Sequence, residues 1–385
     1  MKEKTFTKDA ILALIGAFCY ISCATMAMPI TAGFTKSLGG SAELMGIMTG
    51  LMYLVSLCVR PVAGNLADKI SKSTLTIWGS GMMLVSNFAY AMAQDLVTLT
   101  IARIVCGIGY AACTVGLSTW YSMLVPSNKV GKAMGIYGTM QAISMAIVGK
   151  VAISVTEATN ERTAFVISGL FAVVTFVLAF VIKDRGKPIV KEDAVKKKIR
   201  LLDINVLPVA LILMLFTIPY NATQGLIKEY VPERNFNVDA GWFITMYAIF
   251  LIALRVGFRN FFDKVKYRNF LFISLVSSLV AMTSLHFVSN YVFMGIAALC
   301  MAGGYGVMCS VTQATAIKLA GGKENRGVAN STYYMGFDMG MALGPTIGGF
   351  LMANLPVQMF YPALMICSVL AFVIYLVWKK KIDNA

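Results

Sequence analysis

Charged side chains inside long apolar runs are the residues of this sequence most able to do chemistry. Arg103 and Asp338 lie well inside such runs, and Lys150 lies toward the outer part of a third. A charge at the centre of a bilayer costs about 2.5–3.5 kcal/mol on insertion scales, so such groups are normally paired or line a water-filled path. Asp338 is the one carboxylate near the middle of its run, and it is therefore a candidate proton carrier.

Each of these charges also has a purely structural interpretation. Arg103 could pair with a backbone carbonyl or a neighbouring helix, and Asp338 could hold a polar cluster together. Lys150 is expected to extend its ammonium group to the outer lipid headgroups. If Lys150 faced the interior instead, the cations would outnumber Asp338 and favour an anionic solute.

Residues for enzyme chemistry or for a metal are scarce. The single histidine, His286, cannot form a His-dependent acid–base pair or a multi-histidine metal site. The eight cysteines include no CxxC pair, and no GxxxxGK[ST] phosphate-binding loop occurs. We therefore expect no enzyme activity, no metal and no cofactor.

The elements that position these residues follow from the composition. Hydrophobic residues make up 58% of the 385 residues and charged residues only 13%, against about 25% charged in a typical soluble domain. A helix needs about 20 apolar residues to cross the hydrocarbon, and the first such run is expected to be a permanent membrane helix, not a cleaved signal peptide. The sequence predicts an all-α integral membrane protein with twelve transmembrane helices. The spans are near 10–33, 43–62, 74–94, 97–122, 131–156, 163–182, 204–227, 239–259, 269–288, 291–318, 327–353 and 358–378.

The net charge of +15 reflects topology. Most of the 33 Lys and Arg residues lie in alternate loops, in the two terminal segments and in the polar stretch 183–203. Because cytoplasmic loops are enriched in Lys and Arg, both termini and this stretch are predicted to be cytoplasmic. We expect a monomeric, multi-pass protein of the cell (plasma) membrane. Its expected partners are the lipid bilayer, a small-molecule solute and protons, and not nucleic acid.

A repeat divides the chain into two halves. Arg60, Asn65, Asp68 and Lys69 recur at identical spacing as Arg255, Asn260, Asp263 and Lys264. A second echo matches Gly131, Ala133 and Tyr137 with Gly327, Ala329 and Tyr333. We predict two parallel six-helix repeats, residues 1–182 and 204–385, joined by a cytoplasmic linker over 183–203. Such an architecture places a solute site near the membrane midplane between the halves.

These residues carry a resemblance to a known family. The loop Gly64-Asn-Leu-Ala-Asp68-Lys, with Arg60 ahead of it, is similar to the signature of the major facilitator superfamily between its second and third helices. The fourth span resembles that superfamily's pattern through Arg103 and Gly107. The resemblance implies a secondary transporter of the same fold, a conformational latch on the cytoplasmic side, and a role for Arg103 in proton coupling or substrate binding. The predicted cytoplasmic gate comprises Arg60, Gly64, Asp68, Arg255 and Asp263.

The eleventh span carries a glycine–proline pattern, Gly340-x-x-x-Gly344-Pro345-x-x-Gly348-Gly349. It resembles a signature that proton-driven antiporters of the superfamily carry on their fifth helix, whereas here it occupies the equivalent helix of the other half. Small residues at this spacing also let helices approach closely. The pattern therefore predicts a bending, closely packed helix without indicating the direction of transport.

Polar and aromatic side chains within the spans are candidates for a substrate cavity. They are Tyr20, Gln141, Tyr220, Asn221, Gln224, Tyr305, Tyr334 and Phe337. Most aromatic residues in such a chain only pack or lie at the membrane interface. We predict a secondary active transporter that moves a small organic solute by alternating access and is coupled to protons, with Arg103 and Asp338 in coupling or translocation. The alternatives are a multidrug efflux antiporter and a transporter-like receptor that binds a ligand without transport.

Overall fold

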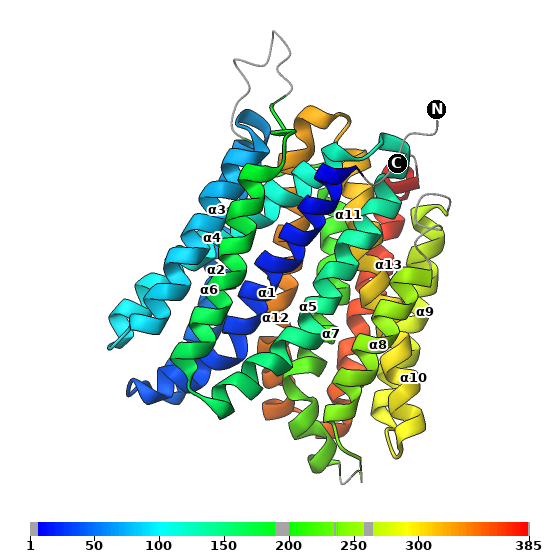
Figure 1. Ribbon diagram of the computed structural model, residues 1–385. Coiled ribbons are helices and arrows are strands. Elements are labelled where there is room, and N and C mark those ends of the chain that lie inside the picture. The colour runs from blue at the N-terminus through cyan, green and yellow to red at the C-terminus, as the bar shows by residue number, and fades with distance from the viewer. Residues whose placement is uncertain (1–6, 189–199, 235, 237, 258–264, 384–385) are drawn as a thin grey trace. The chain divides into compact units, whose positions relative to one another are not determined.

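The structure is a computed structural model that describes residues 7–188, 200–234, 236, 238–257 and 265–383. Helices form almost all of the described chain, and it contains no strand (Figure 1). The helices of the first half are α1 (Lys8–Ser37), α2 (Ala42–Lys69), α3 (Lys72–Met92), α4 (Leu96–Leu124), α5 (Val130–Ala158) and α6 (Glu161–Val181). Those of the second half are α7 (Leu207–Glu233), α8 (Gly241–Gly257), α9 (Tyr267–His286), α10 (Tyr291–Met301), α11 (Val307–Leu319), α12 (Arg326–Asn354) and α13 (Phe360–Asp383).

Every predicted span overlaps a helix of the structure, which confirms the all-α prediction. The predicted span 291–318 consists of α10, a π-helical segment η4 (Ala302–Gly306) and α11 in succession. Within the described residues, nine helices are long and apolar enough to cross a membrane, and α8 is a shorter apolar helix. These lengths and compositions fit a multi-pass membrane protein.

The chain forms two compact units that do not follow the linear halves. Unit 1 comprises residues 1–129, 140–203 and 320–332, and unit 2 comprises residues 130–139, 204–319 and 333–385. The first turns of α5 therefore belong to unit 2, although the rest of α5 belongs to unit 1. The first turns of α12 likewise belong to unit 1, although the rest of α12 belongs to unit 2.

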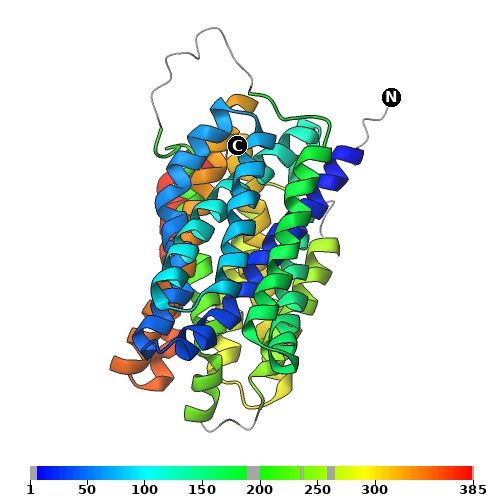
Figure 2. The ribbon, with the colours of Figure 1, turned by 60° about the vertical axis from the view of Figure 1, so that its left-hand side comes forward.

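Close helix contacts build unit 1. Helix α3 lies beside α4 and α6 in Figure 1, and α1 lies beside α6 in Figure 2. Gly79 and Gly109 allow α3 and α4 to approach, because a Cβ on Gly109 would lie 2.7 Å from the Gly79 carbonyl oxygen. Ser168 Oγ lies 2.7 Å from Asn87 Oδ1 and 2.8 Å from the Cys23 carbonyl oxygen, so its single proton is shared between the two acceptors and ties α1, α3 and α6 together. These hydrogen bonds satisfy polar groups that would otherwise be costly to bury.

The glycines of α12 face α7 in unit 2. Gly336, Gly340, Gly344 and Gly348 recur every fourth residue and so share one face of the helix. A Cβ on Gly340 would lie 2.5 Å from Thr217 Cβ, and one on Gly344 would lie 2.7 Å from Asn221 Cβ. The glycine pattern of this span therefore serves close packing of α12 on α7.

Candidate functional site

The end of α2 and the start of α12 meet within unit 1. Asp68, in the last turn of α2, accepts hydrogen bonds from the backbone N–H groups of Gly327 (2.7 Å) and Val328 (3.1 Å). The N–H groups of the first helical turn have no acceptor within the helix, and a carboxylate is favoured there by the helix dipole. Gly327 is required by this contact, because a Cβ would lie 2.5 Å from the Gly64 carbonyl oxygen.

Three more contacts hold the same helix start. The Ser331 hydroxyl donates to the Arg60 carbonyl oxygen (2.5 Å), and Asn330 Nδ2 donates to Thr119 Oγ1 (3.0 Å). Arg326 Nη1 donates to the Ser122 carbonyl oxygen (2.5 Å). We call the residues that make these bonds, together with Asp68, the α12 latch. The structure thus places Arg60, Gly64 and Asp68, all on α2, against the start of α12, and their role as a gate stays a prediction.

The residues of α12 that complete this latch were not among the predicted gate residues. Their only sequence signal was the echo of Gly131 in Gly327, which marks the helix start without indicating which side chains contact it. Lys72 also lies close, and burial lowers the pKa of its ammonium group while the charge of Asp68 acts in the opposite direction. The carboxylate therefore lies among both amide donors and a cation.

The end of the linker pairs with the latch. Asn65 Oδ1 accepts from the Arg200 backbone N–H (2.9 Å), and Asn65 Nδ2 donates to the Arg200 carbonyl oxygen (2.5 Å). The Asp203 N–H donates to Thr332 Oγ1 (2.9 Å). Asn65 and Thr332 thus hold the linker backbone against the two helix ends that Asp68 joins.

The two residues of the predicted gate that belong to the second half, Arg255 and Asp263, are only partly described. Arg255 in α8 is buried, and its Nε (3.4 Å) and Nη2 (3.1 Å) both donate to the Gly306 carbonyl oxygen in η4. Asp263, the repeat partner of Asp68, lies outside the described residues, as do Asn260 and Lys264. Whether the second half carries an Asp263 latch therefore stays a prediction.

Arg103 lies in the interior of unit 1. Its Nε donates to the Met48 carbonyl (2.9 Å) and its Nη2 to the Thr49 carbonyl (2.9 Å), both on α2. The guanidinium carbon lies 5.7 Å from the centre of the Tyr90 ring on α3. This geometry matches the structural alternative, in which the cation pairs with backbone carbonyls, and a role in coupling stays a prediction.

Asp338 is completely buried in α12 and makes contacts with its surroundings. The side chain of Lys150 lies outside the described part of α5. The burial of Asp338 is compatible with either predicted role, and its part in proton transfer stays a prediction. The orientation of Lys150 also stays a prediction.

The predicted cavity residues fall in both units. Tyr20 and the half-buried Gln141 belong to unit 1, and the other six belong to unit 2. The rings of Tyr220 and Tyr305 stack at 4.1 Å and 16°, and Tyr247 lies 4.9 Å from Tyr220. We call Tyr220, Tyr247 and Tyr305 the tyrosine stack.

The remaining predicted residues of unit 2 lie on α7 and α12. Gln313 Nε2 donates to the Tyr334 hydroxyl (3.0 Å), and Tyr334 meets Phe337 edge-on. Asn221 donates to the Thr217 carbonyl of its own helix, whereas Gln224 is half-buried. Tyr334 is thus engaged with Gln313 of α11 and with Phe337, and Asn221 with its own helix, and the role of the set in a cavity stays a prediction.

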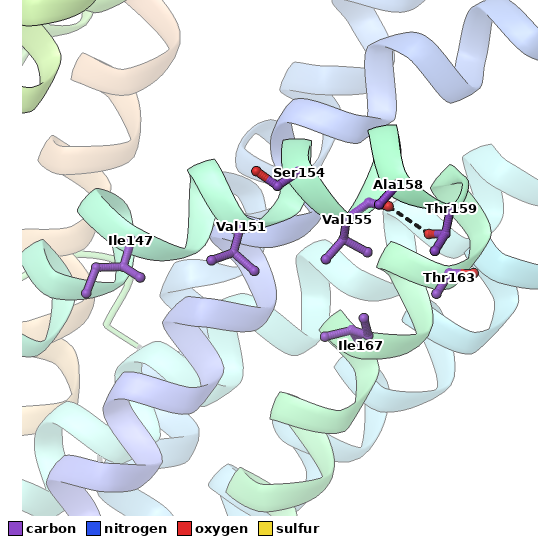
Figure 3. Close-up of a pocket in the computed structure, with 8 residues that line it drawn as sticks. All are labelled: Ile147, Val151, Ser154, Val155, Ala158, Thr159, Thr163 and Ile167. Atoms are coloured by element: carbon purple, nitrogen blue, oxygen red, sulfur yellow. Dashed lines mark hydrogen bonds between the residues drawn. The ribbon is translucent and has the colours of Figure 1, made fainter.

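A separate apolar groove lies between the C-terminal part of α5 and the start of α6 (Figure 3). Its volume is about 620 Å³, and its walls are Ile147, Val151, Ser154, Val155, Ala158, Thr159, Thr163 and Ile167. The Thr159 hydroxyl at its edge donates to the Val155 carbonyl (2.7 Å). None of the predicted site residues lines the groove, whose chemistry suits an apolar chain and no charged solute.

Comparison with known proteins identifies the family. The sequence model of the Major Facilitator Superfamily matches residues 13–323 and, in a second match, residues 238–384. The chain belongs to the Major Facilitator Superfamily. It is therefore a transporter of multi-pass membrane topology, and the predicted resemblance is confirmed.

Sequence relatives agree with this assignment. The chain is 24% identical over 340 residues to quinolone resistance protein NorA of Staphylococcus aureus (strain MSSA476), covering 85% of each protein. It is 21% identical over 380 residues to the uncharacterized MFS-type transporter YhhS of Escherichia coli (strain K12), covering 94% of this chain and 91% of the relative.

Solved structures share the fold. A bacterial homologue of the iron transporter ferroportin, in an outward-facing state, matches with a TM-score of 0.78 at 15% identity over 97% of this chain and 100% of that one. The human organic anion transporter MFSD10 (TETRAN) matches with a TM-score of 0.74 at 11% identity over 95% of this chain and 98% of that one. At these identities the likeness establishes the superfamily fold and not the solute.

Proposed function

We propose that this transporter moves a small organic solute across the plasma membrane by alternating access, with both termini in the cytoplasm and with proton coupling. The observation that carries the proposal is the pair of hydrogen bonds from the start of α12 to Asp68. They join the end of α2 to a helix start from the other half of the chain. Opening of the cytoplasmic side requires these bonds to break.

The strength of the α12 latch suits such a switch. A hydrogen bond to a charged group contributes about 1.5–3 kcal/mol, and a neutral one about 0.5–1.5 kcal/mol. A few bonds of this kind are strong enough to favour one state and weak enough for a solute or a proton to shift the balance. Asp68 accepts the strongest hydrogen bonds of the latch, and Ser331, Asn330 and Arg326 donate the remaining ones.

Proton coupling is proposed for Asp338. Its carboxyl group is completely buried within α12, the helix whose start the latch holds. An ionisable group at this depth is normally functional, and proton relays in transporters use carboxylates. We expect Asp338→Asn to abolish uphill transport while leaving solute exchange intact, as measured in proteoliposomes with and without an imposed pH gradient. Unchanged uphill transport by this variant would remove Asp338 from the mechanism.

Reconstitution tests the whole proposal. Purified protein in liposomes is screened with metabolites and drugs, first for binding by thermal shift and then for flux under pH gradients of either sign. Flux that collapses with the gradient is the expected result. Ligand binding with no flux under any gradient would instead support the receptor alternative.

Multidrug efflux is the second candidate, and the similarity to NorA favours it. Structurally unrelated drugs would then drive proton release from the same vesicles. A single solute class with saturating, mutually exclusive binding would favour a dedicated transporter. The expected functional unit in either case is a monomer.

A further inference from the structure

The candidate is a cluster of buried polar atoms around Arg255 in unit 2. Two of the three guanidinium nitrogens of Arg255 donate to the Gly306 carbonyl, whereas Nη1 is buried with no hydrogen-bond partner. The hydroxyls of Ser310 and Tyr247 are also buried without partners. Only 3% of Arg255, 2% of Ser310 and 4% of Tyr247 is exposed, so water does not reach them freely.

These atoms converge on one place. A Cβ on Gly138 would lie 2.6 Å from Ser310 Oγ and 3.0 Å from Arg255 Nη1, so both atoms face the same point of α5. A Cβ on Gly306 would lie 3.6 Å from the Tyr247 hydroxyl, which puts that hydroxyl beside the carbonyl that Arg255 binds. Three donors, one of them charged, are thus grouped within unit 2.

The charge of this cluster points to an anion. Among the described residues, the hydrogen bonds of Arg255 go to a neutral carbonyl group, and a buried cation without a counter-charge is unfavourable. An N–H group and two hydroxyls can all donate to the oxygens of a carboxylate, and such charge-assisted bonds are the stronger kind. A carboxylate at the place where Gly138 now lies would therefore satisfy Arg255 Nη1 and the Ser310 hydroxyl together, with the Tyr247 hydroxyl near Gly306 as a further donor.

The neighbouring surface adds an aromatic preference. Tyr247 belongs both to this cluster and to the tyrosine stack, whose other members lie on α7 and on η4. Aromatic rings favour offset or edge-on contact with another ring. The π-helical turn that carries Tyr305 and Gly306 is a feature often found at functional sites.

We infer that Arg255, Ser310 and Tyr247 form a binding site for the carboxylate of an aromatic carboxylic acid, whose ring lies against the tyrosine stack. Gly138 covers the donors in this structure, so the site opens when the first turns of α5 withdraw. The inference rests on the proposed function for its role as a substrate site. Binding itself is measured without transport, so a failure here would leave the transport proposal standing.

The test uses benzoate, with benzamide as a neutral probe of the same shape. The full-length protein is purified in detergent in a buffer without carboxylates, and its melting temperature is followed as each probe is added. Benzoate is expected to raise the melting temperature and benzamide to leave it nearly unchanged. Equal shifts by the two probes would overturn the inference.

Variants locate the site. Ser310→Ala and Arg255→Lys are each expected to weaken benzoate binding about tenfold, because each loses a hydrogen bond to a charged group. Ser284→Ala, another buried serine of unit 2, and Arg162→Lys, whose guanidinium donates to the Ala91 and Ala93 carbonyls in unit 1, are the matched controls and should bind benzoate as the unaltered protein does. Size-exclusion profiles establish that each variant is folded, and Ser310→Ala keeps the test valid if Arg255→Lys does not fold. Binding that survives Ser310→Ala, or a loss shared with the controls, would overturn the assignment.

Discussion

The starts of α5 and α12 occupy equivalent positions in the two repeats, yet they are held in different ways. The start of α12 is fixed in unit 1 by backbone N–H groups that donate to Asp68 and by hydrogen bonds that Ser331, Asn330 and Arg326 donate. The start of α5 lies in unit 2 with Gly138 against Arg255 and Ser310, and its N-cap residue Lys129 makes no side-chain capping bond. Directional bonds hold the start of α12, and at Gly138 the first turns of α5 pack closely over the donors of Arg255 and Ser310.

This difference separates two tasks. The bonds of the α12 latch can be lost one at a time, and each loss shifts the balance between states by a measurable factor. Withdrawal of Gly138 exposes buried donors all at once, so a ligand that satisfies them favours the withdrawn state. In the proposed mechanism, the start of α12 sets the stability of the closed state, and a ligand at the site that Gly138 covers favours opening.

The largest effect is expected from Asp68→Asn. The variant loses the charge that faces two backbone N–H groups, and bonds to a charged acceptor contribute about 1.5–3 kcal/mol. Hydrogen exchange at Gly327 and Val328 should therefore quicken by about tenfold or more, as measured by exchange mass spectrometry on the peptide over 326–332. Asp95→Asn is the matched control, because Asp95 accepts from the Thr98 N–H (2.7 Å) at the start of α4. It should change exchange near Thr98 only; unaltered exchange at Gly327 in Asp68→Asn would remove Asp68 from the latch.

A smaller effect is expected from Gly138→Ala, which acts on the other helix start. The new Cβ would lie 2.6 Å from Ser310 Oγ, and overpacking of this kind costs about 1–3 kcal/mol. The melting temperature of the purified protein should fall. Gly149→Ala on the same helix meets nothing within 4 Å and should not lower it. Equal melting temperatures for the two variants would show that Gly138 does not pack on the Arg255 cluster.

The smallest effect is expected from Thr332→Val, which keeps the shape of the side chain. It removes the neutral hydrogen bond from the Asp203 N–H, together with a bond within α12 to the Val328 carbonyl. Such a bond contributes about 0.5–1.5 kcal/mol, so exchange at Asp203 should quicken by no more than about tenfold. Thr346→Val, which loses only a bond within α12, is the control and should leave Asp203 unaffected. An effect as large as that of Asp68→Asn would mean that the linker, and not Asp68, dominates the latch.

The sequence predicted the helices well because apolar length is a local property. Every predicted span overlaps a helix, and the glycine spacing of α12 predicted its close packing on α7. The exchange of helix starts between the two units was not predictable, because it depends on contacts between residues about 260 positions apart, such as Asp68 and Val328.

The site was predicted less completely than the fold. Arg60, Gly64 and Asp68 were found through a repeated motif, whereas Ser331 and Asn330 have no distinctive spacing. Arg103 and Arg255 also look alike in the sequence, because each is a single arginine within an apolar run. Each arginine keeps one buried Nη1 without a hydrogen-bond partner. Arg103 donates to two carbonyls of α2, whereas Arg255 donates twice to the Gly306 carbonyl and lies beside Gly138. Only the contacts of each side chain distinguish these cases.

The four glycines that seat α12 on α7 also determine where α12 can bend. These glycines bring α12 so close to α7 that an added Cβ at any of them would meet atoms of α7. We therefore expect the part of α12 over 336–348 to move together with α7. The first turns of α12, through Thr332, cluster with unit 1 instead. If the start of α12 moves as proposed, its bend is expected between Thr332 and Gly336, the stretch that carries Tyr333 and Tyr334.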